Sequence, residues 1–170
     1  MKEGAVVAHE DEVDRIVAAW ERERPDVDVS PMQVLSRVSR LAHHLDQARK
    51  TAFAAHELDP WEFDVLSALR RSGSPYELSP GRLVAETFVT SGTMTNRIDR
   101  LTERGLVQRR PDPEDRRGVL VQITDDGRAR VDAAVAELLH RESEILSGLS
   151  APARERLTGD LRNLLSPFDD

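Results

Sequence analysis

Residues 90–123 constrain the fold most, because a helical pattern is followed there directly by two strand patterns. Thr90 and Ser91 are residue types that cap the start of a helix, and Gly105 suits the left-handed position just after its end. The residues between them repeat at helical spacing and predict one apolar stripe, formed by Met94, Ile98 and Leu101. The segment therefore begins with an amphipathic helix.

Two strand patterns follow this helix at residues 106–109 and 119–123, and the charged turn PDPEDRRG joins them. Residues 80–87 predict a small helix capped by Ser79, so a helix, a turn and a second helix precede the hairpin. A short strand is also expected near Leu78. The pattern predicts a winged helix-turn-helix, and the fold class is mainly α with a small β wing (α+β).

The polar face of the second helix carries hydroxyl, amide and guanidinium groups. Such groups match the base edges and phosphates of a DNA major groove. The alternative is a solvated helix beside a surface hairpin, but the arginine-rich hairpin directly after the helix favours a contact with double-stranded DNA. The residues expected to make this contact are Ser91, Thr93, Thr95, Asn96, Arg97, Arg100, Arg116 and Arg117.

The distribution of charge matters more here than its sum. The chain has a net charge of −7, which by itself disfavours a polyanionic partner. Residues 97–117, however, carry seven arginines against five acidic residues. A basic reading segment on an acidic body is compatible with DNA binding and predicts modest non-specific affinity.

Long helical patterns lie on both sides of the winged helix-turn-helix. Residues 9–24 predict a short helix ended by Pro25, and residues 30–57 predict a long one. Two more helices are expected, at about 125–148 and from Pro152 onward. Their apolar stripes exceed what a winged helix can cover, so they indicate a partner surface, most economically a second copy. A twofold dimer would place the two DNA-contacting helices, one from each copy, about one DNA turn apart, which predicts a palindromic site.

These helix and strand patterns divide the 170 residues into three parts. Residues 1–28 form an N-terminal helical extension. Residues 29–58 and 124–167 form a helical dimerisation region, and residues 59–123 form the winged helix-turn-helix that binds DNA. The length fits one domain with helical extensions.

Several protein classes are disfavoured by the sequence. Cysteine is absent, so disulfides, thiolate nucleophiles and thiolate zinc sites are excluded. No apolar run approaches the ~18 residues of a membrane span, and the polar, acidic N-terminus does not resemble a signal peptide, so a cytoplasmic protein is expected. His43 and His44 are adjacent on a helix and do not face one way. We expect no metal site, no cofactor and no catalytic residues, and hence no enzyme.

Asp64 stands out within the predicted helix of residues 59–72. That helix is apolar on most sides, and a buried acid costs several kcal/mol unless it is paired. An arginine is the expected partner, unless Asp64 lies on the one solvated side.

The segment DPEDRRGVLVQITDDG resembles the wing signature of the MarR family of transcriptional regulators, and the resemblance covers about residues 30–165. The matching positions are Asp115, Arg117, Thr124 and Gly127. The resemblance implies that Asp115 supports the wing and that Arg117, together with Arg116, enters the minor groove. It also implies a winged-helix homodimer that usually represses transcription and releases DNA on binding a small aromatic anion.

A narrower resemblance is to the urate-responsive, PecS-like branch of that family. Its members carry an N-terminal helix with a tryptophan, an acid before the helix-turn-helix and arginines on and after the recognition helix. The comparable positions, which the resemblance assigns to ligand binding, are Trp20, Asp64, Arg97 and Arg109. An aromatic face can stack on a flat purine, and arginine can hold its anionic form.

We therefore expect a homodimeric, ligand-responsive DNA-binding regulator, most often a repressor, released by urate or a related aromatic anion. Two alternatives remain open. One is a winged-helix regulator without a small-molecule effector, and the other is a winged-helix module for protein contacts.

Overall fold

The computed structural model describes residues 10–115 and 117–168, and the chain divides into two units, residues 1–47 and 48–170. The first unit contains α1 (Glu12–Glu23) and most of α2 (Pro31–Ala54), the helix that continues into the second unit. Each unit is described by itself. Among the described residues, no helix has the length and apolar character that a membrane span requires.

Helix α1 is fixed at its start by a capping box. The Asp11 side chain accepts the backbone N–H groups of Val13 and Asp14, and the Asp14 carboxylate accepts the N–H of Asp11. Val13 and Val17 are buried. The guanidinium of Arg37 on α2 donates to Asp11 at 2.9 Å and to Asp14 at 2.7 Å, which ties the start of α1 to α2.

The second unit is a helical domain with a three-stranded antiparallel sheet. Its helices and strands, in chain order, are α3 (Pro60–Arg71), β1 (Glu77–Leu78), α4 (Pro80–Thr87), α5 (Ser91–Glu103), β2 (Val107–Pro111), β3 (Val119–Ile123), α6 (Asp125–Ile145), α7 (Ala151–Leu165) and a short 3-10 turn, η1 (Ser166–Phe168).

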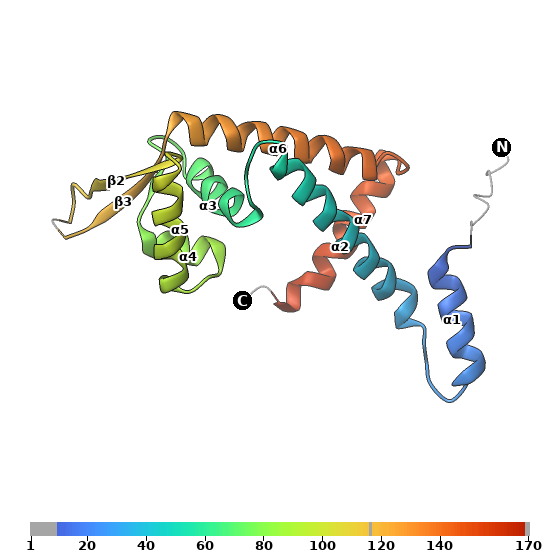
Figure 1. Ribbon diagram of the computed structural model, residues 1–170. Coiled ribbons are helices and arrows are strands. Elements are labelled where there is room, and N and C mark those ends of the chain that lie inside the picture. The colour runs from blue at the N-terminus through green and yellow to red at the C-terminus, as the bar shows by residue number, and fades with distance from the viewer. Residues whose placement is uncertain (1–9, 116, 169–170) are drawn as a thin grey trace. The chain divides into compact units, whose positions relative to one another are not determined.

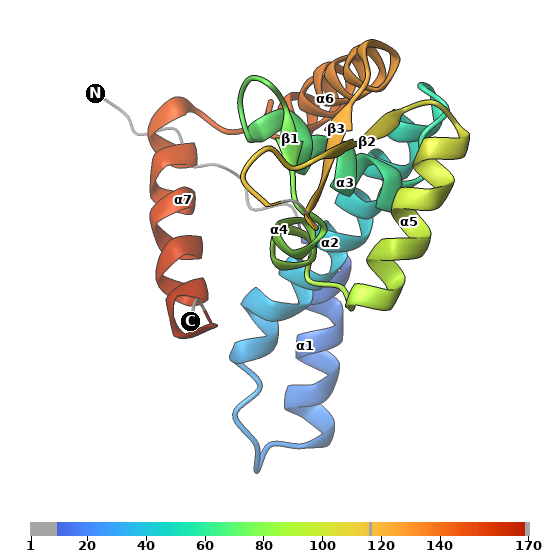
Figure 2. The ribbon, with the colours of Figure 1, turned by 90° about the vertical axis from the view of Figure 1, so that its left-hand side faces the viewer.

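The strands follow the order β1–β3–β2, and the register pairs Val107 with Ile123 and Pro111 with Val119. The β2–β3 hairpin extends away from α3, α4 and α5 (Figure 1). Figure 2 shows the three strands next to one another beside these helices. This arrangement confirms the predicted fold class, mainly α with a small β wing.

The core of this unit lies beneath α5. Met94, Ile98 and Leu101 are each at most 1% exposed, so the predicted apolar stripe is buried. They belong to one cluster with buried side chains of α3, β3 and α6, for example Leu66, Val121 and Val131. Burial of these residues settles which side of α5 faces outward, and the polar side follows from it.

Candidate nucleic-acid interface

The helix-turn-helix of α4 and α5 presents the candidate interface. Ser79 caps α4 by accepting the N–H of Arg82 at 3.3 Å, and Phe88 then takes a left-handed conformation (φ 52°) that turns the chain. Thr90 caps α5 by accepting the N–H of Thr93 at 3.3 Å. Helix α5 therefore begins at a defined residue directly after a tight turn.

The outward side of α5 carries most of the residues expected to contact DNA. Ser91, Thr93, Thr95, Asn96 and Arg100 are exposed, and Arg97 is half-buried. The Thr95 hydroxyl donates to the carbonyl of Ser91 at 3.1 Å, so its hydrogen is already used within the helix. The Asn96 amide and the two guanidinium groups are thus the strongest hydrogen-bond donors on this side.

The two outward arginines of α5 lie over an aromatic ring. The guanidinium carbon of Arg100 is 4.7 Å from the centre of the Trp61 ring, and that of Arg97 is 5.7 Å from it. Trp61 belongs to the first turn of α3, and together with Thr93 and Asn96 these residues line a shallow hollow. Sequence reasoning did not single out Trp61, because no pattern within α3 says that its ring meets α5.

Other arginines near α5 are paired with acids. Arg109 on β2 forms an ion pair with Asp99 on α5, and Arg104 at the end of α5 forms one with Glu62 on α3. These contacts hold the ends of α5 and β2 in place. They also reduce the charge that either arginine offers to an anion.

The wing turn is organised by aspartate side chains. The Asp115 carboxylate accepts the N–H of Arg117 at 2.9 Å, and the Asp112 carboxylate accepts the N–H of Glu114 at 2.9 Å. Arg117 is exposed, whereas Arg116 lies outside the described residues. The structure thus places Asp115 where a residue that supports the wing would be.

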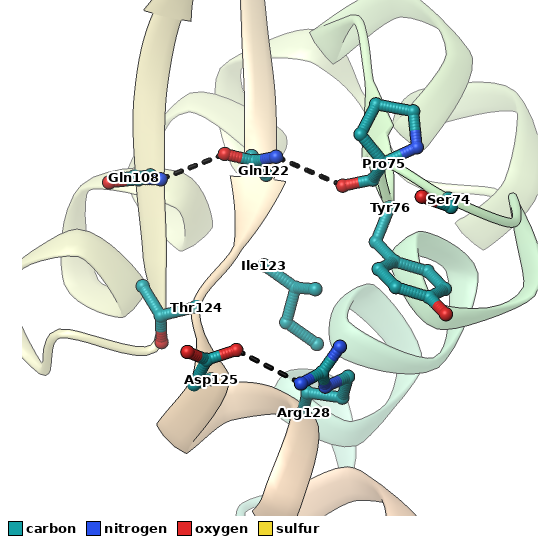
Figure 3. Close-up of a pocket in the computed structure, with 9 residues that line it drawn as sticks. All are labelled: Ser74, Pro75, Tyr76, Gln108, Gln122, Ile123, Thr124, Asp125 and Arg128. Atoms are coloured by element: carbon teal, nitrogen blue, oxygen red, sulfur yellow. Dashed lines mark hydrogen bonds and ion pairs between the residues drawn. The ribbon is translucent and has the colours of Figure 1, made fainter.

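A polar hollow lies at the base of the wing (Figure 3). The amide of Gln108 donates to Gln122 at 2.8 Å, and that of Gln122 donates to the carbonyl of Pro75 at 3.0 Å. Arg128 forms an ion pair with Asp125 at 3.0 Å. Each of these polar groups therefore has a partner within the hollow. The glutamine bonds link β2 to β3, and β3 to the segment before β1.

The buried acid of α3 is Glu62, not Asp64. Glu62 is 1% exposed and accepts both the guanidinium of Arg104 and the N–H of Asp59, the latter at 2.9 Å. Asp64 is half-buried and pairs with Arg49 at 3.4 Å, so the expected arginine partner is present. The spacing Asp59-x-x-Glu62, typical of a capping box, was the signal that could have identified Glu62.

The four residues that the resemblance assigns to ligand binding fall in both units. Trp20 in the first unit is 46% exposed and lines an apolar hollow with Val27 and Met32. In the second unit Asp64, Arg97 and Arg109 each have the separate partner described above. No cluster of metal-ligating side chains occurs within residues 10–115 and 117–168.

A helix-turn-helix with an outward basic helix and an arginine-bearing wing defines a winged-helix DNA-binding protein. The sequence pattern of the MarR family matches residues 56–118. The HTH-type transcriptional regulator PecS of Dickeya dadantii (strain 3937) is 40% identical over 146 residues, which are 86% of this chain and 88% of PecS. The chain belongs to the MarR family of transcriptional regulators, and the predicted similarity to PecS is confirmed.

Two further relatives agree with this assignment. The HTH-type transcriptional repressor NicR of Pseudomonas putida is 31% identical over 82% of this chain and 89% of NicR. The structure of BpsR from Bordetella bronchiseptica, whose DNA binding is regulated by 6-hydroxynicotinic acid, superposes with a TM-score of 0.57. It is 31% identical and covers 75% of this chain and 91% of BpsR. The relatives are named as regulators of transcription and not as enzymes.

Proposed function

We propose that this protein is a cytoplasmic homodimeric repressor that binds a palindromic DNA site and leaves it when a small aromatic anion, urate or a related compound, binds. The observation that carries the proposal is the outward side of α5. It presents the amide of Asn96 and the guanidinium groups of Arg97 and Arg100 on a helix whose opposite side is buried.

These groups suit sequence reading in a major groove. An asparagine amide can pair with an adenine edge in two hydrogen bonds, and arginine can do the same with guanine. Arg117 on the exposed wing turn is available to phosphates or to the minor groove. The α5 side chains would then supply specificity and the wing would add affinity.

A homodimer is supported by apolar side chains that remain exposed on the flanking helices. In the first unit these are Val34, Leu35, Val38 and Leu41 of α2. In the second unit they include Leu139 and Ile145 of α6 and Leu161, Leu164 and Leu165 of α7. Stripes of this size on a single chain support a partner surface, and a second copy gives two reading helices for a palindrome.

An aromatic anion as effector is supported by the relatives and by one local feature. PecS is similar over most of the chain, and BpsR responds to the aromatic acid 6-hydroxynicotinic acid. The apolar hollow beside Trp20 offers a flat surface of the kind that stacks on an aromatic ring.

The DNA part of the proposal is tested by comparing Arg117→Ala and Asn96→Ala on genomic fragments that the wild-type protein selects. If Arg117 neutralises one phosphate per protomer, its loss should flatten the slope of log K against log[salt] by about 0.9 per contact. Asn96→Ala should relax sequence preference by about 1–3 kcal/mol at one base pair. An unchanged salt slope in Arg117→Ala would oppose the phosphate contact. An equal loss of affinity on all sequences in Asn96→Ala would oppose base reading by Asn96.

The effector part is tested by titrating the DNA complex with urate, salicylate and 6-hydroxynicotinate. Release by one of them at micromolar to millimolar concentration is expected. Trp20→Ala should keep DNA affinity and lose that release. Release that persists in Trp20→Ala would place the effector elsewhere, and no release by any compound would favour a regulator without a small-molecule effector.

A further inference from the structure

Trp61 lies on α3, outside α5, the helix proposed to read DNA. Its indole N–H donates to the carboxylate of Asp59 at 3.3 Å, the residue that precedes the first turn of α3. Its ring is half-buried. The orientation of the indole is thus fixed from α3, and its open face is turned to α5.

The guanidinium groups of Arg97 and Arg100 both lie over this ring, at 5.7 and 4.7 Å from its centre. Within the described residues neither of them has an ion pair with a carboxylate, unlike Arg104 and Arg109. The ring is therefore the contact that restricts these two long side chains on an otherwise open surface.

We propose that Trp61 is a positioning residue that holds Arg97 and Arg100 in the orientation in which they meet DNA. The inference rests on the proposed role of α5 in reading DNA. Ordering a free, rotamer-rich side chain on binding costs free energy, and this cost is smaller when the side chain is already ordered.

An aromatic ring is suited to this task because it leaves the positive charge available. A carboxylate would also hold an arginine, but it would cancel the charge that attracts phosphate and would have to be displaced. The indole attracts the guanidinium through its π face, and tryptophan is the best side chain for this contact. DNA can then approach the exposed side of each guanidinium.

The test uses this 170-residue chain and a DNA fragment that it selects. Trp61→Leu removes the π face and keeps an apolar side chain, and it should weaken binding at least tenfold, because two arginines in each protomer must then be ordered on binding. Trp61→Phe keeps a π face and should recover most of the affinity. The midpoint of thermal unfolding of each variant separates this effect from a loss of folding.

A second background distinguishes positioning from simple packing. In an Arg97→Gln/Arg100→Gln protein, Trp61→Leu should have little further effect on DNA binding. In an Arg117→Ala protein, the matched control on the wing, it should have its full effect. Equal loss in both backgrounds, or no recovery in Trp61→Phe, would overturn the positioning role.

The remaining outcomes separate this inference from the proposed function. If Arg97→Gln/Arg100→Gln weakens DNA binding and Trp61→Leu does not, the positioning role fails while the reading surface stands. If the double arginine variant binds DNA like the wild type, the reading surface assigned to α5 and the role of Trp61 both fail.

Discussion

Gly127, in the first turn of α6, lies against the backbone carbonyl of Leu106, which is between α5 and β2. A Cβ atom added there would be 2.2 Å from the carbonyl oxygen of Leu106 and 3.0 Å from a side-chain carbon of Ile123. The oxygen belongs to the backbone, so it cannot move without shifting the start of β2. Gly127→Ala should therefore lower the free energy of unfolding by about 1–3 kcal/mol, the range for overpacking, as measured by urea denaturation.

Gly159 on α7 is the matched control for this substitution. A Cβ atom there would meet nothing within 4 Å. Gly159→Ala should raise stability by about 0.5–1 kcal/mol, since alanine favours the helix more than glycine. Similar effects of the two substitutions would contradict the close approach at Gly127.

Glu62 is the second position where one residue has a large expected effect. Arg104→Met would leave its buried carboxylate without the guanidinium, and losing one partner of a buried pair costs about 3–5 kcal/mol. We expect the low end of that range, because Arg104 itself reaches solvent. Glu62→Gln, which carries no charge, should cost less, and adding it to Arg104→Met should restore part of the stability in urea denaturation.

A larger loss of stability in Glu62→Gln than in Arg104→Met would contradict the importance of the guanidinium for the buried carboxylate. If Glu62→Gln were more damaging than Arg104→Met, the carboxylate would be stabilised chiefly by its hydrogen bond from Asp59. The double variant would then be no more stable than either single one.

At the scale of helices and strands, the sequence predicted best those elements whose ends are marked locally. The helix expected at 80–87 is α4, because Ser79 and Pro80 mark its start, and the strand expected at 119–123 is β3. The long helix expected at 30–57 ends earlier, at Ala54. There the chain turns at Glu57 (φ 55°), which contacts Arg104 and Arg130 from distant parts of the sequence.

The residues of the candidate interface were predictable only where the pattern of a single helix determines them. The polar side of α5 follows from its own apolar stripe, so its outward residues could be named from the sequence. Trp61 could not be assigned, because its role depends on how α3 packs against α5. Periodicity also could not tell which acid of α3 is buried, since that depends on the position of Arg104.

The first helix provides a prediction at this scale. The hydrogen bond that Arg37 donates to Asp11 lowers the pKa of Asp11, and the one that Arg37 donates to Asp14 is the largest cause that raises the pKa of Arg37. The stabilisation from the Asp11 carboxylate is thus present above its unfolded pKa, about 3.9, and is lost as pH falls through the lowered value. The protection of the α1 amides against hydrogen exchange, relative to their intrinsic exchange rate at each pH, should fall in that acidic range.

Arg37→Gln should accelerate exchange in α1 already at pH 7, because it removes the contacts from α2 to Asp11 and Asp14. Arg22→Gln is the control, since Arg22 pairs with its neighbour Glu23 on α1 itself. Equal exchange rates in both variants would show that the α2 contacts do not protect α1.

For the whole molecule, charge and assembly are coupled. The chain carries −7 overall, so in the proposed function its binding to DNA would depend on the few arginines of α5 and the wing. One set of such contacts gives modest affinity. In the proposed homodimer, two sets would act together on one DNA molecule, which would raise the affinity for a site with matching half-sites.

This coupling leads to a prediction for α7. Its apolar side chains repeat at helical spacing and are between 36% and 57% exposed, namely Leu157, Leu161, Leu164 and Leu165. Leu161→Glu would place a charge in that stripe, and burying an unpaired charge in a dimer interface is strongly unfavourable. Sedimentation velocity at micromolar concentration should show monomers, and binding to a palindromic fragment should weaken far more than binding to a half-site.

Asn163→Asp is the matched control, because it adds a charge to the same helix two residues away, off the stripe. It should remain dimeric and bind DNA nearly as well as the wild type. If Leu161→Glu also stayed dimeric, α7 would not belong to the interface. A wild-type chain that is monomeric at micromolar concentration would remove the homodimer, and with it the palindromic site, because one reading helix has no geometric reason to prefer a repeated half-site.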